Sequence, residues 1–436
     1  MYKNYNRSNS PRHHIILFLL CTFLIYMVLG SGDHSFVNAE FIFNLEVIFT
    51  SMYILFFLKE VANPIQDIKK YKSTIILLAL WACSVTYSYL SSTYYIDPSS
   101  PVFSSIYETK YPYARYRLSQ TFMHIMFFIA IWHYLKNSSI NLNYIFYTIT
   151  ISTILVAIYF FYHWFNNTWH DFGRTSNDPP LNSHVRHTGY QVEAALSFFF
   201  IFLIRNCKKN DITFSHIFGY IFLWGFLFWL GGRGAILATF TSFIVIVLIL
   251  KYKEINYRNI VIITIPSIFI GMFLSEFLSV YPWNGVLELF QRSISSESFN
   301  QLSAGRMVIW ATVIESLSGN VFFGLGPQGF YLMENSIKGF VQPHNFILQF
   351  LIEWGVVGTF LFLLLLLKAT WAGIKLHVLN KDRIFSPSAL AAGAVICTLS
   401  VNALTDGTYY HPQPSVYLAL AFAIWVLPPK RKTMTS

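Results

Sequence analysis

The chain has 436 residues, of which 55% are hydrophobic and only 11% are charged, and its formal net charge is +10. Soluble globular proteins carry about 25% charged residues, so this composition excludes a soluble protein and indicates an all-α polytopic membrane protein. A charge of +10 can accompany nucleic-acid binding, but in a membrane protein it more often reflects where the loops lie, and no nucleic-acid partner is expected. The four cysteines show no metal-ligand spacing and no phosphate-binding loop is present, so no metal, cofactor or use of ATP is expected.

Apolar runs recur along the whole chain. The first, residues 15–29, follows a basic N-terminus and is either a cleaved signal peptide or, as the many later runs favour, an uncleaved span. Because about 20 apolar residues cross a bilayer, we expect about 12 transmembrane helices. They lie near residues 15–29, 36–58, 74–92, 118–135, 144–165, 190–204, 212–230, 234–250, 260–278, 344–367, 388–404 and 415–427. The second is the least certain, since it contains Glu40, Asn44 and Glu46.

The basic residues orient these spans. If the N-terminus is cytoplasmic, 21 of the 30 Lys and Arg residues fall on the cytoplasmic side, as the positive-inside rule requires. Both termini are then cytoplasmic. Residues 1–278 form spans one to nine, 279–343 form a large ordered outer cap loop, and 344–436 form spans ten to twelve with a cytoplasmic tail.

Arginine dominates the outer side of this layout. Seven arginines and two lysines lie there, whereas the inner side holds 15 lysines and six arginines. Because arginine binds phosphate bidentately, this bias indicates an anionic ligand, most simply a phosphate or diphosphate. The alternative is that the arginines pair with outer acids (Asp171, Asp178, Glu288 and Glu297). Three outer arginines are candidate ligands: Arg233 within Gly231-Gly232-Arg233-Gly234 at a span junction, Arg186 before the sixth span, and Arg306 at the start of a helix expected over 304–318.

The tenth span begins with Pro343-His344-Asn345. Asn345 is a good helix N-cap, and its position would hold the His344 imidazole at the membrane boundary, where histidine could exchange a proton. The alternative is that His344 is only an interfacial residue. Gly355 and Gly358 are expected to give this helix a small-residue packing face. Asp406, in a loop near the chain end, could orient a histidine, bind a sugar hydroxyl or simply form a turn.

Together these residues fit an anionic lipid substrate in the outer leaflet. One chemistry they could support is glycosyl transfer from a lipid diphosphate. The arginines would stabilise the charge that grows on the leaving diphosphate, and the histidine would accept the proton of an attacking sugar hydroxyl.

Several motifs resemble the O-antigen ligase and polymerase superfamily. Gly232-Arg233-Gly234-Ala235 resembles its arginine-glycine-alanine signature, and Gly305-Arg306 with Trp310 resembles its outer-loop region. Most specific is His344-Asn345, then nine residues, Gly355, two residues and Gly358, which matches the ligase pattern. The resemblance is strong from Gly231 to Thr359.

The resemblance implies a metal-independent, inverting glycosyltransferase of the GT-C type. It would transfer a glycan from undecaprenyl diphosphate to a hydroxyl of lipid A-core oligosaccharide, on the periplasmic face of a Gram-negative inner membrane. Its partners would be this lipid-linked glycan, the lipid A-core acceptor and membrane lipids. His344 would be catalytic and Arg233 and Arg306 would bind the diphosphate, with Arg186 added on position alone.

Three other functions remain open. An O-antigen polymerase would use a similar arginine-rich cavity, and a protein O-oligosaccharyltransferase shares the histidine motif. A lipid or polysaccharide transporter is less favoured, because the chain has no internal repeat and its candidate residues gather at one face.

Overall fold

The chain is built from helices. A computed structural model describes residues 11–29, 35–61, 65–92, 111–166, 185–207, 213–253, 257–278, 285–296, 298–317, 321–332, 342–380 and 386–428, and no strand occurs among them. The long helices are α1 (Pro11–Leu29), α2 (Ser35–Val61), α3 (Ile65–Ser92), α5 (Tyr111–Asn137), α6 (Asn143–Phe165), α7 (Val185–Cys207), α8 (Phe214–Trp229), α9 (Arg233–Tyr252), α10 (Arg258–Phe277), α15 (Phe346–Gly373), α16 (Pro387–Asn402) and α17 (Pro412–Trp425). The short ones are α11 (Val286–Ile294), α12 (Phe299–Leu302), α13 (Arg306–Ser316) and α14 (Gly329–Leu332), and a π-helical segment (Ile374–Leu379) extends α15.

Each of the twelve apolar runs seen in the sequence falls on one of these long helices. Five described segments are long and apolar enough to cross a membrane by length and composition: Tyr71–Ser92, Asn143–His163, Arg233–Tyr252, Arg258–Phe277 and Phe346–Leu379. The protein is therefore an all-helical membrane protein with several spans. The total of twelve spans and the GT-C type stay predictions.

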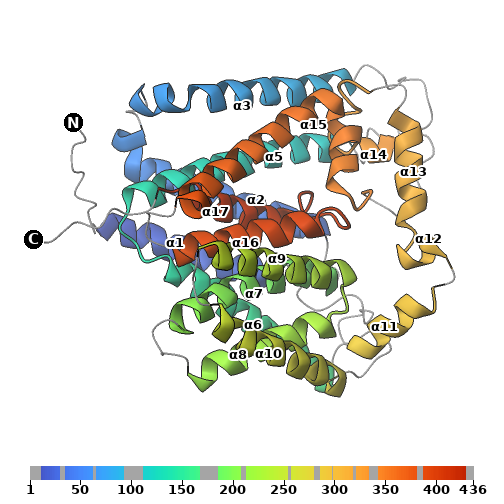
Figure 1. Cartoon of the computed structure of the whole chain (residues 1–436). Coiled ribbons are helices and arrows are strands. Elements are labelled where there is room, and N and C mark those ends of the chain that lie inside the picture. The colour runs from blue at the N-terminus through green and yellow to red at the C-terminus, as the bar shows by residue number, and fades with distance from the viewer. Residues whose placement is uncertain are drawn as a thin grey trace, which may run out of the picture.

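Helix α16 lies at the centre of the bundle, where it packs against α7, α9 and α17. Its buried face is rich in small side chains, among them Ala391, Ala392 and Ala394. Small residues allow helices to approach each other closely without a hydrophobic driving force. Helices α3 and α15 lie together at one edge of the bundle and α8 and α10 at the other (Figure 1).

The long helices share two ends. At one end, the end of α17 meets the end of α15, because Trp425 Nε1 donates to the Thr370 carbonyl at 3.1 Å, and Lys253 at the end of α9 donates to the Asn380 carbonyl at 2.7 Å. At the other end lie the starts of α9, α15 and α17 and the end of α16, which we call the site end. This arrangement agrees with the alternation of spans that the basic residues predict.

Short helices cross the site end. Figure 1 shows α11, α12 and α13 lying across the ends of the long helices rather than along them. The expected helix over 304–318 is present as α13, and Arg306 is its first residue. The division into residues 1–278, 279–343 and 344–436 stays a prediction.

Helix α15 is interrupted at Gly355, which has φ +65° and ψ −173°. The backbone of residues 321–326 fills the break: Val356 N donates to the Val321 carbonyl and Leu325 N to the Ile352 carbonyl, at 2.8 and 2.7 Å. A Cβ on Gly355 would lie 2.3 Å from the Phe322 carbonyl carbon.

A neighbour does pack closely on Gly355, as the small-residue face predicted, but that neighbour is the backbone of the cap segment and the helix is broken there. That glycine supplies a left-handed backbone conformation that only glycine adopts without cost, and the interrupted helix is fastened there to the cap segment. Gly358 lies against its own helix at Trp354 and near Ser84 of α3.

Candidate functional site

The backbone at His344 is held in an unusual conformation. His344 has φ +51°, the left-handed region that a residue with a side chain rarely adopts. Hydrogen bonds fix the residues on both sides: Trp310 Nε1 of α13 donates to the Pro343 carbonyl at 2.8 Å, and Phe346 N donates to the Ala403 carbonyl at 3.0 Å. Non-glycine residues in such conformations cost about 1–3 kcal/mol and persist where surrounding structure imposes them, often at functional sites.

Asn345 caps α15, as its sequence position predicts. Its side-chain oxygen accepts from Ile347 N and Leu348 N at 3.0 and 3.1 Å, and its side-chain amide donates to the Leu404 carbonyl at 3.0 Å. The same residue therefore begins the helix and ties it to the turn after α16. This turn brings Asp406 to the histidine.

His344 and Asp406 form a close pair. The imidazole Nδ1 lies 3.0 Å from Asp406 Oδ1, which also accepts from Gly407 N at 2.8 Å. Burial by itself raises the pKa of Asp406, but the hydrogen bond to His344 and the charges of His344, Arg306 and His411 lower it far below its usual range. Asp406 is therefore ionised at neutral pH, and His344 donates to it through Nδ1–H. In the neutral form of a histidine that donates through Nδ1–H, the lone pair that accepts a proton lies on Nε2.

The candidate arginines lie differently with respect to this pair. The charge of Arg306, at the start of α13, acts directly on Asp406. Arg233 begins α9, and a Cβ on the adjacent Gly234 would lie 2.6 Å from Thr405 Oγ1, so the start of α9 contacts the turn that carries Asp406. Arg186 is in the first turn of α7, but its side chain lies outside the described residues.

One outer arginine forms an ion pair with an outer acidic residue instead of being available for a ligand. Arg292 Nε lies 3.6 Å from Glu288 Oε1, one turn away on α11. This arginine pairs with an outer acid, as the sequence left open.

A second histidine, His411, is close enough to the pair for its charge to act on Asp406. The Gln342 amide donates to His411 Nε2 at 2.9 Å, and the His411 ring lies 4.4 Å from the ring of His187 and 5.8 Å from that of Tyr190. Burial lowers the pKa of His411 well below its usual value; the charges of His187 and Arg117 lower it further, whereas Asp406 raises it. His411 is therefore neutral at pH 7.

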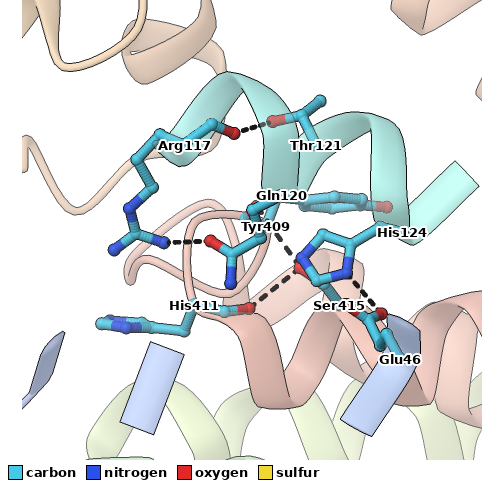
Figure 2. A network of polar contacts seen from close by, with 8 residues as sticks. All are labelled: Glu46, Arg117, Gln120, Thr121, His124, Tyr409, His411 and Ser415. Carbon is cyan, nitrogen blue, oxygen red and sulfur yellow. Dashed lines mark hydrogen bonds and ion pairs between the residues drawn. The ribbon is translucent and has the colours of Figure 1, made fainter. Parts of the chain in front are cut away.

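Arg117 of α5 also lies at the site end. The sequence analysis placed it among the seven outer arginines but did not single it out. It is buried, donates to the Gln120 side chain at 2.8 Å and to the Tyr410 carbonyl at 3.0 Å, and lies 4.3 Å from the centre of the Tyr410 ring. Figure 2 shows it beside His411. The Tyr410 hydroxyl accepts from the Gln328 amide of the cap segment at 2.6 Å. Arg117 and Tyr410 thus join α5, the cap and the turn after α16.

Glu193 of α7 supports the same turn and was also missed by sequence reasoning. It is fully buried, and its Oε1 accepts from the Asn402 side chain at 2.6 Å. The Asn402 carbonyl in turn accepts from Thr405 N and Asp406 N, each at 2.9 Å. A glutamate within an apolar helix was the signal that could have identified it.

One of the two acidic residues that made the second span uncertain has a partner. Glu46 of α2 is buried, and its Oε1 lies 2.6 Å from Nδ1 of His124 on α5 (Figure 2). His124 follows Arg117 by two turns of that helix. This pairing explains how a carboxyl group is accommodated inside an apolar segment.

Fold and site together define a helical membrane protein with a histidine–carboxylate pair beside arginines at one end of its bundle. A family model described as O-antigen ligase matches residues 218–363, from α8 to the second part of α15. This match, over about a third of the chain, supports membership of the O-antigen ligase superfamily; the family in general implies an enzyme of the glycosyl-transfer type, a lipid-linked glycan and a lipid acceptor. No curated protein matches the chain.

Proposed function

We propose that the protein is an O-antigen ligase that transfers a glycan from undecaprenyl diphosphate to a hydroxyl of lipid A-core oligosaccharide. The reaction takes place on the periplasmic face of a Gram-negative inner membrane and inverts the anomeric carbon. The observation that carries the proposal is the His344–Asp406 pair, 3.0 Å apart, in which the charge of Arg306 helps to lower the pKa of the Asp406 carboxyl group.

His344 is the base in this proposal. The acceptor hydroxyl oxygen attacks the anomeric carbon of the donor glycan and its proton passes to His344 Nε2, while Asp406 holds the ring through Nδ1–H and stabilises the imidazolium that forms. A carboxylate in this position also fixes the histidine tautomer, as in other histidine–carboxylate catalysts.

The arginines act on the leaving group. The bond between the anomeric carbon and the diphosphate oxygen breaks, and its electron pair leaves with undecaprenyl diphosphate. Arg306 and Arg233, with Arg186 from α7, neutralise this charge as it develops, and preorganised positive groups of this kind stabilise a transition state strongly. Asn345 and the broken helix at Gly355 hold His344 in place. Because the donor is already activated, the step consumes no ATP.

The orientation of the site rests on the distribution of charge. The starts of α9, α15 and α17 share one end of the bundle, and the basic residues of the sequence favour the other end as cytoplasmic. This supports a periplasmic site and cytoplasmic termini.

The test is complementation of a deletion strain, read out as lipopolysaccharide on a gel together with the pool of lipid-linked glycan. We expect the deletion to leave core without O-antigen and to accumulate polymer on its lipid carrier, and we expect no rescue by His344→Ala or Arg306→Ala. Arg292→Ala, which removes an arginine paired with Glu288, is the matched control and is expected to rescue.

Each other outcome assigns a different function. Core that carries a single repeat unit indicates an O-antigen polymerase. Normal lipopolysaccharide with altered glycoproteins indicates a protein O-oligosaccharyltransferase, and lipid-linked glycan trapped on the cytoplasmic face indicates a transporter. Full rescue by His344→Ala would remove the histidine from the mechanism.

A further inference from the structure

Helix α11 has an apolar stripe that nothing in the described structure covers. Three of its side chains are largely exposed: Leu287, Phe290 and Ile294, at 57, 52 and 83%. At about 100° per residue these three fall within an arc of roughly 60° on the helix surface. Three neighbouring large apolar side chains, all exposed on so short a helix, require an explanation.

The other residues of α11 divide into two further faces. Val286 is buried and Leu289 is half-buried, and both pack against the main hydrophobic core of the bundle. Glu288, Gln291 and Arg292 lie on a polar face, where Glu288 and Arg292 pair with each other. The bundle-facing, apolar exposed and polar faces are roughly a third of a turn apart around the helix.

A hydrogen bond fixes the depth of α11 along the bundle. The backbone N–H of Leu287 is one of the donors at the start of α11 that have no partner within the helix. It donates to Glu276 Oε2, in the last turn of α10, at 3.0 Å. Helix α10 is long and apolar enough to cross the membrane, and its exposed side chains near this end include Phe273 and Phe277, at 74 and 77%. The start of α11 therefore lies beside the last turn of α10, at the level where that span ends (Figure 1).

We propose that α11 is an interfacial helix that rests on the bilayer, with Leu287, Phe290 and Ile294 inserted at the boundary between headgroups and acyl chains. A helix in this position needs one apolar and one polar face, and α11 has both in addition to its contact with the bundle. The polar face with Arg292 then faces the headgroups and water.

Lipid is the occupant that the observations favour over a second protein chain. Leu287 lies beside the last turn of α10, whose exposed apolar residues Phe273 and Phe277 a bilayer covers in a spanning helix. Three side chains also offer far less surface than the roughly 800 Å² per partner that a stable protein interface buries.

Spin labels on single-cysteine variants test the proposal in the full-length protein reconstituted in lipid nanodiscs. The native cysteines are first replaced by alanine, and labels are placed at Phe290, Ile294 and Gln291 of α11 and at Phe273 of α10. Power saturation then compares collision with oxygen, which partitions into lipid, against collision with a water-soluble nickel chelate. Circular dichroism confirms that each variant remains folded.

We expect the labels at positions 290 and 294 to behave like the one at 273, with oxygen collisions dominant. The label at 291, one residue away on the polar face, reverses this preference. Nickel-dominated collisions at all three α11 positions would place the helix in water and overturn the proposal. Exclusion of both reagents, with spin–spin broadening between labels, would mean that a second copy covers the stripe. The measurement involves no glycan transfer, so its outcome is independent of the proposed reaction.

Discussion

Replacing Asp406 by asparagine isolates the role of its charge. The asparagine oxygen can still accept from Gly407 N, so the turn after α16 should survive, but the ionised partner of His344 Nδ1 is lost. An asparagine amide can also donate to Nδ1, which places the ring proton on Nε2 and removes the lone pair that accepts the hydroxyl proton.

The magnitude follows from the bond that is lost. A hydrogen bond to a charged group contributes about 1.5–3 kcal/mol, which corresponds to a fall of about 10- to 150-fold in kcat. Because the pair acts on the proton transfer and touches no part of the substrate in this mechanism, KM should change little. The double variant with His344→Ala should be no slower than His344→Ala alone, since residues that act as a unit are not additive.

The assay is glycan transfer by the purified protein in nanodiscs, with lipid-linked donor and lipid A-core acceptor. Glu288→Gln, which neutralises an outer carboxylate on α11, is the control and should retain wild-type kcat. The reasoning is refuted if Asp406→Asn retains more than half of the wild-type kcat, or if its loss adds to that of His344→Ala.

Three further predictions concern stability and support of the site. Gly355→Ala should lower the free energy of unfolding by about 2–4 kcal/mol, because it adds a clash with the cap backbone to the strain of a positive φ. Gly305→Ala, with φ +81° and open space around its Cβ, should cost only about 1–2 kcal/mol. Thermal melts in detergent compare the two variants. Glu193→Gln keeps the oxygen acceptor and should retain transfer, whereas Glu193→Leu should lose most of it without loss of expression, as a transfer assay would show. The pKa of His411 is depressed on folding, so the unfolded chain binds more protons and stability should fall as pH drops below about 6.5. His411→Gln should flatten this decline in apparent Tm between pH 7 and 5, and His14→Gln, at an exposed position, should not.

The sequence predicted those features of the fold that depend on residues close together in the chain. Apolar runs predicted the positions of the long helices, and the order of residues around Asn345 and Arg306 predicted that the first caps α15 and the second begins α13. Each of these features depends on residues within a few positions of each other, so no knowledge of the fold was needed.

The parts that could not be predicted depend on contacts between distant segments. Asp406 lies 62 positions after His344, and a turn aspartate before glycine reads equally well as a simple turn. Arg117 could not be separated from the other outer arginines, because its partner Tyr410 is 293 positions away. The break at Gly355 was not predicted, because the segment that fills it comes from the cap, about 30 positions earlier in the chain.

Two backbone outliers, one just before α15 and one within it, explain why the spacing between the histidine and the glycine of the motif matters. His344, with φ +51°, and Gly355, with φ +65°, bracket one short stretch of helix. Its start is tied to the turn that carries Asp406, and its end is tied to residues 321–326 of the cap. Because each residue turns a helix by about 100° and advances it by about 1.5 Å, adding or removing one residue would rotate Gly355 away from the cap backbone or His344 away from Asp406. The spacing therefore sets the geometry of the pair, although Gly355 itself is remote from the imidazole.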